Sequence, residues 1–318
     1  MHIARRSPDP SAHVQAPADA RRQAHVPAVA ALAGAVALLA GVAGCSSGSG
    51  GGGSEALKSL RHMPAGAAAK AVTYVDTARA RELGTTDPKR FSLIGNPASA
   101  VLGSYTAGPW ADTMKQDQID AAVDSGQLGH WDGRFDPAAI EASLRKSGYT
   151  ADEQDGEQVW KPSDGSGPVF VIAKDQIRYS TEAKGFSPTD PAHGKSLADT
   201  KEYQVVAGCM GDVYRADFNT LATGKPVLLS GLGQQADDSG KNTEILCAAV
   251  KDEATADKLA EKLRGVITKQ NERYAGAEVT VTKGDHPVVR TTVPDTSAQR
   301  PGRLYMSDVQ LWMAVGDM

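Results

Sequence analysis

The stretch Ile245-Leu-Cys-Ala-Ala-Val250, followed at once by Lys251-Asp252 and a helical pattern, decides the fold class of this chain. Six consecutive apolar residues predict a strand that is buried on both faces. Asp252 is a favourable N-cap for the helix that follows. The apolar residues of that helix recur along one face, as expected for packing against a core: Ala256, Leu259, Ala260, Leu263, Val266 and Ile267.

Two hairpins are predicted downstream of this helix. Residues 278–282 and 288–293 alternate in polarity around Lys283-Gly284-Asp285, which is a turn sequence. Residues 304–306 and 310–315 are predicted as a second pair of strands around a short polar turn. The order is therefore helix, hairpin, hairpin.

The same order is predicted earlier in the chain. Asp136-Pro137 opens a helix, because Asp caps well and Pro is favoured at the first helical position. A hairpin follows over residues 149–161 around Asp155-Gly156, a strong two-residue turn signal. Residues 169–181 form the next predicted hairpin.

The sequence thus predicts an α+β fold with antiparallel sheets, each faced on one side by helices. The repeated order indicates an internal duplication of a helix–hairpin–hairpin unit, although this order is also common among unrelated α+β domains. We expect a first half over residues 55–190 and a second over 191–318, joined where Gly, Pro, Asp and Ser cluster. Residues 72–75 and 203–209 are predicted as the first strands of the two halves.

The N-terminal region has the pattern of an export signal. Arg21 and Arg22 precede an apolar run over residues 26–42, which is the length of a signal-peptide core and short for a bilayer span. The run ends in Val42-Ala43-Gly44-Cys45, and residues 46–54 are almost entirely Gly and Ser. An uncleaved membrane helix with a chance cysteine is the alternative.

The sequence Val42-Ala43-Gly44-Cys45 resembles the lipobox of bacterial lipoproteins, and with the Gly/Ser stretch it is similar to lipoproteins common in actinobacteria. The resemblance implies that residues 1–44 are a signal peptide and that Cys45 carries lipid. Residues 45–54 would then be a flexible tether with a mean reach of roughly 15–18 Å. It also implies a location on the cell membrane, facing outside the cytoplasm.

The charge of the mature chain limits its partners. Residues 1–44 contain four of the 34 basic residues and two of the 38 acidic ones, so the remaining chain has a formal net charge of −6. This charge argues against nucleic acid as a partner. It argues equally against a general electrostatic attraction to anionic lipid headgroups. The expected partners are the membrane, through the lipid, and a protein or small molecule of unknown identity.

The two other cysteines, Cys209 and Cys247, are predicted to form a disulfide outside the cytoplasm. Two buried free thiols are the alternative. A metal site is disfavoured, because neither cysteine has another ligand at metal-binding spacing. We expect no cofactor.

One loop could hold a ligand. Residues 130–136 gather Trp131, Arg134 and other aromatic and charged side chains before a helix. Aromatic contact area and an Arg that can grip a carboxylate would suit a ligand, which makes Trp131 and Arg134 weak candidate binding residues. The alternative, which we favour, is that the aromatic side chains fill the core.

Other patterns are better explained by structure. Asp117, Asp120 and Asp124 would share one helical face, which is more typical of a solvated surface than of a cation site. Gly231-Leu232-Gly233 lacks the remaining features of a dinucleotide site and is expected to be a turn. The four tryptophans are expected in the core rather than on a sugar-binding platform.

No strong catalytic motif is present. We therefore expect a non-enzymatic, lipid-anchored binding or interaction protein. A solute-binding lipoprotein of an uptake transporter and a carrier of an apolar ligand are the alternatives. Catalysis through residues that only folding brings together is a further one.

Overall fold

The computed structural model describes residues 54–66, 70–102, 110, 113–154, 156–181, 191 and 195–318. The chain divides into two compact units, Met1–Ser49 and Gly50–Met318, of which the first lies outside the described residues. The predicted signal peptide, Cys45 and the predicted tether up to residue 53 also lie outside them. Within the described part of the chain, no helix is long and apolar enough to cross a membrane.

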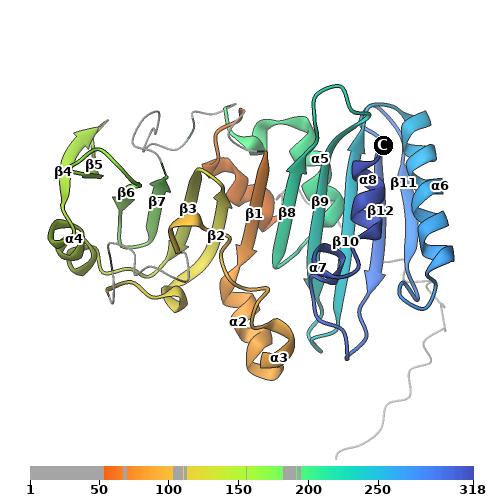
Figure 1. Ribbon diagram of the computed structural model, residues 1–318, viewed down its shortest axis with the longest axis horizontal. Helices are drawn as coiled ribbons and strands as arrows, with labels where there is room; N and C mark the ends of the chain where they lie inside the picture. Colours follow the sequence, from red (N-terminus) through yellow and green to blue (C-terminus); the bar gives the residue numbers. More distant parts are fainter. Residues whose placement is uncertain are drawn as a thin grey trace, which may run out of the picture. The chain divides into compact units, whose positions relative to one another are not determined.

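The described strands form one 12-stranded sheet in which every pairing is antiparallel (Figure 1). The strands are β1 (Ala71–Asp76), β2 (Ile119–Ser125), β3 (Leu128–Gly133), β4 (Tyr149–Gln154), β5 (Glu157–Pro162), β6 (Val169–Ile172), β7 (Gln176–Ser180), β8 (Arg215–Thr220), β9 (Val227–Ala236), β10 (Asn242–Val250), β11 (Glu278–Thr282) and β12 (Val288–Pro294). Their order across the sheet is β11-β12-β10-β9-β8-β1-β2-β3-β7-β6-β5-β4.

Helices connect and cover these strands. They are α1 (Glu55–Ser59), α2 (Thr77–Thr86), α3 (Pro88–Phe91), α4 (Pro137–Lys146), α5 (Lys201–Met210), α6 (Glu253–Lys269), α7 (Arg303–Met306) and α8 (Gln310–Gly316). Short 3-10 helices include η1 (Leu60–His62), η2 (Ala100–Leu102), η4 (Gln116–Gln118) and η5 (Leu197–Asp199).

The predicted α+β class is thus observed, with a single sheet in place of two. Strands β1 and β8 pair in the middle of the sheet and so connect its two halves, with Thr73 opposite Asp217 in the register. On either side of this pair the chain follows a related path. Strands β1 to β3 form a meander, helix α4 follows, and β7 returns to pair with β3. Likewise, β8 to β10 form a meander, helix α6 follows, and β12 returns to pair with β10.

The repeated helix–hairpin–hairpin unit is not observed. Residues 304–306 and 310–315, predicted as strands, belong to helices α7 and α8. Leu311, Ala314 and Val315 are the buried residues of α8, and their spacing of three and four is helical. A four-stranded return follows α4, whereas only two strands and then helices follow α6.

The predicted first strand of the second half is also a helix. Residues 203–209 lie in α5, whose buried positions Tyr203, Val206, Ala207 and Met210 follow the helical period. Helix α5 packs on β9 and β10. Gly231 and Gly233, predicted to lie in a turn, are inside β9, where a Cβ would collide with side chains that include those of Val206 and Met210 of α5. These glycines let the helix approach the sheet closely.

Helices cover both faces of the second half of the sheet, contrary to the expectation of one covered side. Along β10, Ile245, Cys247 and Ala249 belong to a core with α1 and α5. The alternating residues Leu246, Ala248 and Val250 belong to a second core with α6, α7 and α8. This explains the continuous apolar run in β10, since each face needs apolar residues.

On the α6 side of the sheet, a polar strip separates two cores. One core contains Trp131, Phe170 and Ile177, and the other contains Leu232 and Leu246. Between them the register places Asp124, Thr73 and Asp217 side by side on β2, β1 and β8. The Thr73 hydroxyl donates to Asp217 Oδ1 at 2.8 Å.

The predicted aspartate-bearing helix is therefore absent. Asp117 lies in η4, and Asp120 and Asp124 lie on β2, whose register with β3 shifts between Ile119 and Ala121. Asp124 is buried, whereas Asp117 is exposed.

Gly129 gives a test of packing in this region. A Cβ at this position would collide with the Tyr179 ring and the Asp124 carboxylate. We expect Gly129→Ala to lower the free energy of unfolding by about 2–4 kcal/mol, because the overpacked side chains must move. Urea denaturation measures this change. Gly126→Ala, in the same β2–β3 hairpin but with open space around its Cβ, is the control and should change stability little. Equal effects of the two substitutions would contradict the packing argument.

Candidate functional site

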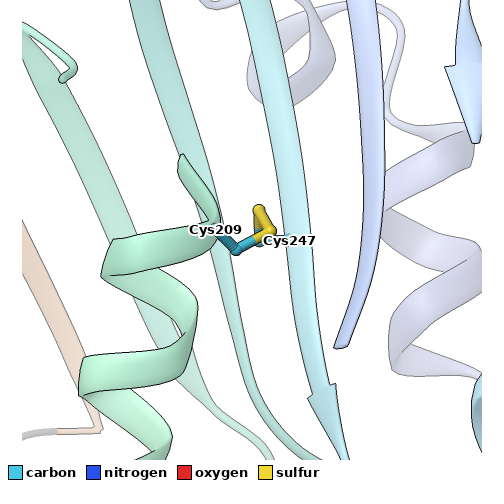
Figure 2. Close-up of a disulfide and its surroundings, with 2 residues drawn as sticks. All are labelled: Cys209 and Cys247. Atoms are coloured by element: carbon cyan, nitrogen blue, oxygen red, sulfur yellow. A yellow bond between two sulfur atoms is a disulfide. The ribbon is translucent and has the colours of Figure 1, made fainter. Parts of the chain in front are cut away.

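Cys209 and Cys247 form the predicted disulfide, with their Cα atoms 6.2 Å apart and a sequence separation of 38 (Figure 2). Cys247 is fully buried on β10, and Cys209 is half-buried near the end of α5. The bond therefore ties a helix to the sheet, rather than one strand to another as predicted. It closes a loop that contains β8 and β9.

The structure does not bring Trp131 and Arg134 together into a ligand site. Trp131 is fully buried on β3, and its indole Nε1 donates to Asp124 Oδ1 at 2.9 Å. The Arg134 side chain is 75% exposed and pairs with Asp120. Asp136 caps α4 by accepting from the Ala139 N–H, so the segment between β3 and α4 has an evident structural role. Trp110 and Trp160 are buried in the same core as Trp131.

Asp124 is the most unusual carboxyl group of this region. The sequence analysis singled it out only for a helical spacing that the structure lacks. Its Oδ1 accepts hydrogen bonds from Trp131 Nε1 and from the Tyr179 hydroxyl at 2.7 Å. Its Oδ2 is buried and has no hydrogen-bond partner among the described residues. Burial raises the pKa of Asp124 to about 7, although interactions with Trp131, Tyr179 and the Ala98 backbone act in the opposite direction.

A backbone segment bridges the polar strip above this carboxyl group. The Ile94 carbonyl accepts from Arg215 at 3.1 Å, and the Ser99 hydroxyl donates to the Tyr179 hydroxyl at 2.8 Å. Arg215 in turn holds both carboxylate oxygens of Asp217. The segment from Ile94 to Ser99 therefore reaches from β8 to β7. Asp124 lies in the interior of the body as a result and is only 1% exposed.

A second buried acid, Glu244, stabilises the other half. Its carboxylate accepts from Gln234 Nε2 and from the backbone N–H groups of Arg303 and Leu304 at 2.8–3.2 Å. Burial, with a further contribution from nearby Asp295, raises the pKa of Glu244 to about 7. Arg303 donates to Asp295 and Asp308, so the network fixes α7 against β9, β10 and β12. Both oxygens are occupied, which gives Glu244 a structural role.

A surface cavity of about 750 Å³ lies between α1–η1 and η5–α5. We call it the α1 cavity. It is lined by Leu57, Lys58, Arg61, His62, Pro191, Ser196, Ala198, Asp199 and Gln204. Three of these side chains, Lys58, Arg61 and His62, are basic and come from the first two elements after the predicted tether.

Two further cavities differ in character. A groove of about 410 Å³ lies beside the β8–β9 turn, and its apolar lining includes Leu197, Tyr203, Leu221 and Leu228. Leu228 is 39% exposed at a register shift of β9 against β10, which takes it out of the alternating pattern. A smaller cleft of about 200 Å³ at the end of β1 is mainly acidic.

Metal binding has no evident site in this part of the molecule. Among the described residues, no group of three or more His, Cys, Asp or Glu side chains is arranged to hold a metal ion. His130 is buried, and its ring stacks on His62 with centroids 3.7 Å apart, while its Nε2 lies 3.0 Å from Asp132.

Comparison with known proteins adds no further assignment. The chain matches no protein-family model, no curated protein and no solved structure.

The disulfide should contribute measurably to stability. In the loop-entropy model, a closed loop of this length stabilises the folded state by about 4 kcal/mol. We expect Cys209→Ala/Cys247→Ala to lose stability of that order in urea denaturation. A reducing agent should lower the stability of the native sequence to that of the variant and leave the variant unchanged. A reducing agent without effect on the native sequence would contradict the pairing.

Asp124 should make stability depend on pH. Its pKa is about 7 in the folded state, against an ordinary 3.8, so the folded state binds the proton more tightly. The stabilisation is complete below the unfolded pKa and is lost as pH rises through 7, with a slope of up to about 1.4 kcal/mol per pH unit. We expect Asp124→Asn to remove this part of the slope in urea unfolding between pH 5 and pH 7. Asp117→Asn, at an exposed position, should leave the slope unchanged. An unaltered slope in Asp124→Asn would show that this carboxyl group is not the titrating one.

Proposed function

We propose that this protein is a lipoprotein, attached through Cys45 to the outer face of the cell membrane, and that its folded body binds a partner there. The observation that carries the proposal is the disulfide between Cys209 and Cys247. Disulfides persist in oxidising compartments outside the cytoplasm and are rare inside it. The bond supports export, and the lipobox-like sequence around Cys45 supports retention at the membrane.

We also propose that the body acts by binding rather than by catalysis. Acids with a pKa near 7 often mark catalytic sites. Among the described residues, the two acids with that property, Asp124 and Glu244, are both buried and hydrogen-bonded to the fold. Their shifted pKa values are explained by burial, and neither borders the cavities described above. Surface cavities such as the α1 cavity favour recognition of a ligand.

The continuous sheet disfavours the transporter alternative. Solute-binding proteins close two lobes around a hinge. In this chain β1 and β8 are paired over five residues, so the two ends of the sheet form one unit. The apolar groove beside the β8–β9 turn supports the alternative of an apolar ligand, because Leu228 is exposed in it.

Lipid attachment can be tested in cells through Cys45. Cells producing the protein are fed an alkyne-labelled fatty acid, and the purified protein is examined for label and for intact mass. We expect Cys45→Ala to abolish the label and to change the location of the protein, because the thiol is the attachment point. Ser46→Ala should retain both label and membrane association. Label that persists in Cys45→Ala, or a native protein that retains residues 1–44, would contradict the proposal.

A further inference from the structure

The α1 cavity lies next to the point where the predicted tether joins the folded body. Ser54, the last tether residue, caps α1 by accepting from the Leu57 N–H at 3.3 Å. Lys58 and Arg61 follow within the next two turns of helix and line the cavity. If Cys45 is lipidated, the tether's mean reach of roughly 15–18 Å keeps these side chains near the bilayer surface.

The cavity walls are firmly held. The Ala65 N–H donates to the Lys195 carbonyl and the Leu197 N–H to the Met63 carbonyl, both at 2.8 Å. Ala56 and Leu60 are buried in the core beneath α1 and η1. The stacked rings of His62 and His130 hold the end of η1 on the sheet. The basic side chains therefore project from a fixed backbone.

Two basic groups of the cavity, Arg61 and Lys58, are available to an anion. Arg61 is exposed and makes no hydrogen bond or ion pair with any described residue. Lys58 pairs with Glu55 at 2.6 Å, but both side chains are about half or more exposed, and such a pair contributes little energy. Asp199, the acidic residue in the lining, already accepts from the Ser196 N–H and hydroxyl.

The formal net charge of −6 argues against a general attraction of the body to an anionic membrane. The repulsion from each acidic group, however, falls off with its distance from the bilayer. Charges are screened over about 8 Å at physiological ionic strength. The tether residues 46–54 are uncharged, so the charged residues of α1 and η1 are the first ones beyond the lipid in sequence. Acidic groups on more distant parts of the body are screened from the bilayer, so the groups around the cavity decide the interaction. These are the cations Lys58 and Arg61 and the acids Glu55 and Asp199.

We propose that the α1 cavity binds the phosphate of an anionic lipid headgroup in the membrane that anchors the chain. This inference rests on the proposed function, since the lipid anchor is what brings the cavity to the bilayer. Arg61 would contact the phosphate oxygens, because its planar guanidinium suits two parallel hydrogen bonds. Lys58 would supply a second charge.

Vesicle binding by the unlipidated mature chain tests the proposal. The chain carries Cys45→Ser, so that the acyl groups do not determine binding, and retains its disulfide. Co-sedimentation compares vesicles of phosphatidylcholine with vesicles that also contain phosphatidylglycerol. We expect binding only to the anionic vesicles, and we expect Lys58→Gln/Arg61→Gln to weaken it about 25-fold, or about fivefold for each cation.

The controls separate a local site from a change in total charge or in fold. Lys269→Gln/Arg300→Gln removes two exposed cations outside the cavity and should alter binding less than twofold. Circular dichroism and an intact disulfide would show that the variants are folded. Equal losses in the two double variants would overturn the proposal, as would binding that does not depend on phosphatidylglycerol.

Inorganic phosphate distinguishes the two sources of the same chemistry. Millimolar phosphate and additional phosphatidylglycerol are each used to displace the protein from anionic vesicles. If phosphate displaces it as effectively as phosphatidylglycerol does, the cavity is a site for a free anion, and the lipid proposal is overturned. Failure of this experiment leaves the lipid anchor unaffected, because fatty-acid labelling of Cys45 in cells tests that anchor separately.

Discussion

The pairing of β1 with β8 is the constraint on which the rest of the structure depends. It joins strands that are far apart in sequence, and it places the two ends of the sheet in one continuous surface. On one face of this seam, Val72 and Tyr74 share a core with Phe218, α1 and α5. On the other face, Thr73, Asp217 and Arg215 satisfy one another with hydrogen bonds. Apolar packing on one side is thus combined with a paired polar strip on the other.

Two buried acids show how differently a carboxyl group can be accommodated in such a fold. Glu244 has donors on both oxygens and a nearby Arg303, so burial of the group is compensated by specific contacts. Asp124 has donors on one oxygen only among the described residues. For Asp124, protonation lowers the cost of burial, since a neutral group needs less solvation. In both cases the carboxyl group bonds to residues within the fold and does not line the surface cavities described above.

Local sequence signals predicted the elements that local chemistry determines. The Asp136-Pro137 cap, the pairing of β4 with β5, the α6 pattern after Asp252 and the Cys209–Cys247 pair are all confirmed, while Asp155 of the predicted turn lies outside the described residues. The errors occurred where apolar runs were too short for their period to be decided: α5 and α8 were predicted as strands. The single sheet could not be predicted, because the β1–β8 pairing depends on contacts between distant segments. The environments of Asp124 and Glu244 were missed for the same reason, since their burial comes from residues elsewhere in the chain.

The disulfide has a mechanical consequence for a chain that is pulled from its two ends. The loop between Cys209 and Cys247 contains β8, so one strand of the seam lies inside a covalent ring. Under tension, this ring transmits force across its 6.2 Å Cα separation, whereas 38 residues of free chain would extend by roughly 130 Å. The ring therefore withholds that length from extension. Stretching must separate β1 from β8 or pull the outer strands off the sheet. Strands β8 and β9 lie inside the ring and bear no tension.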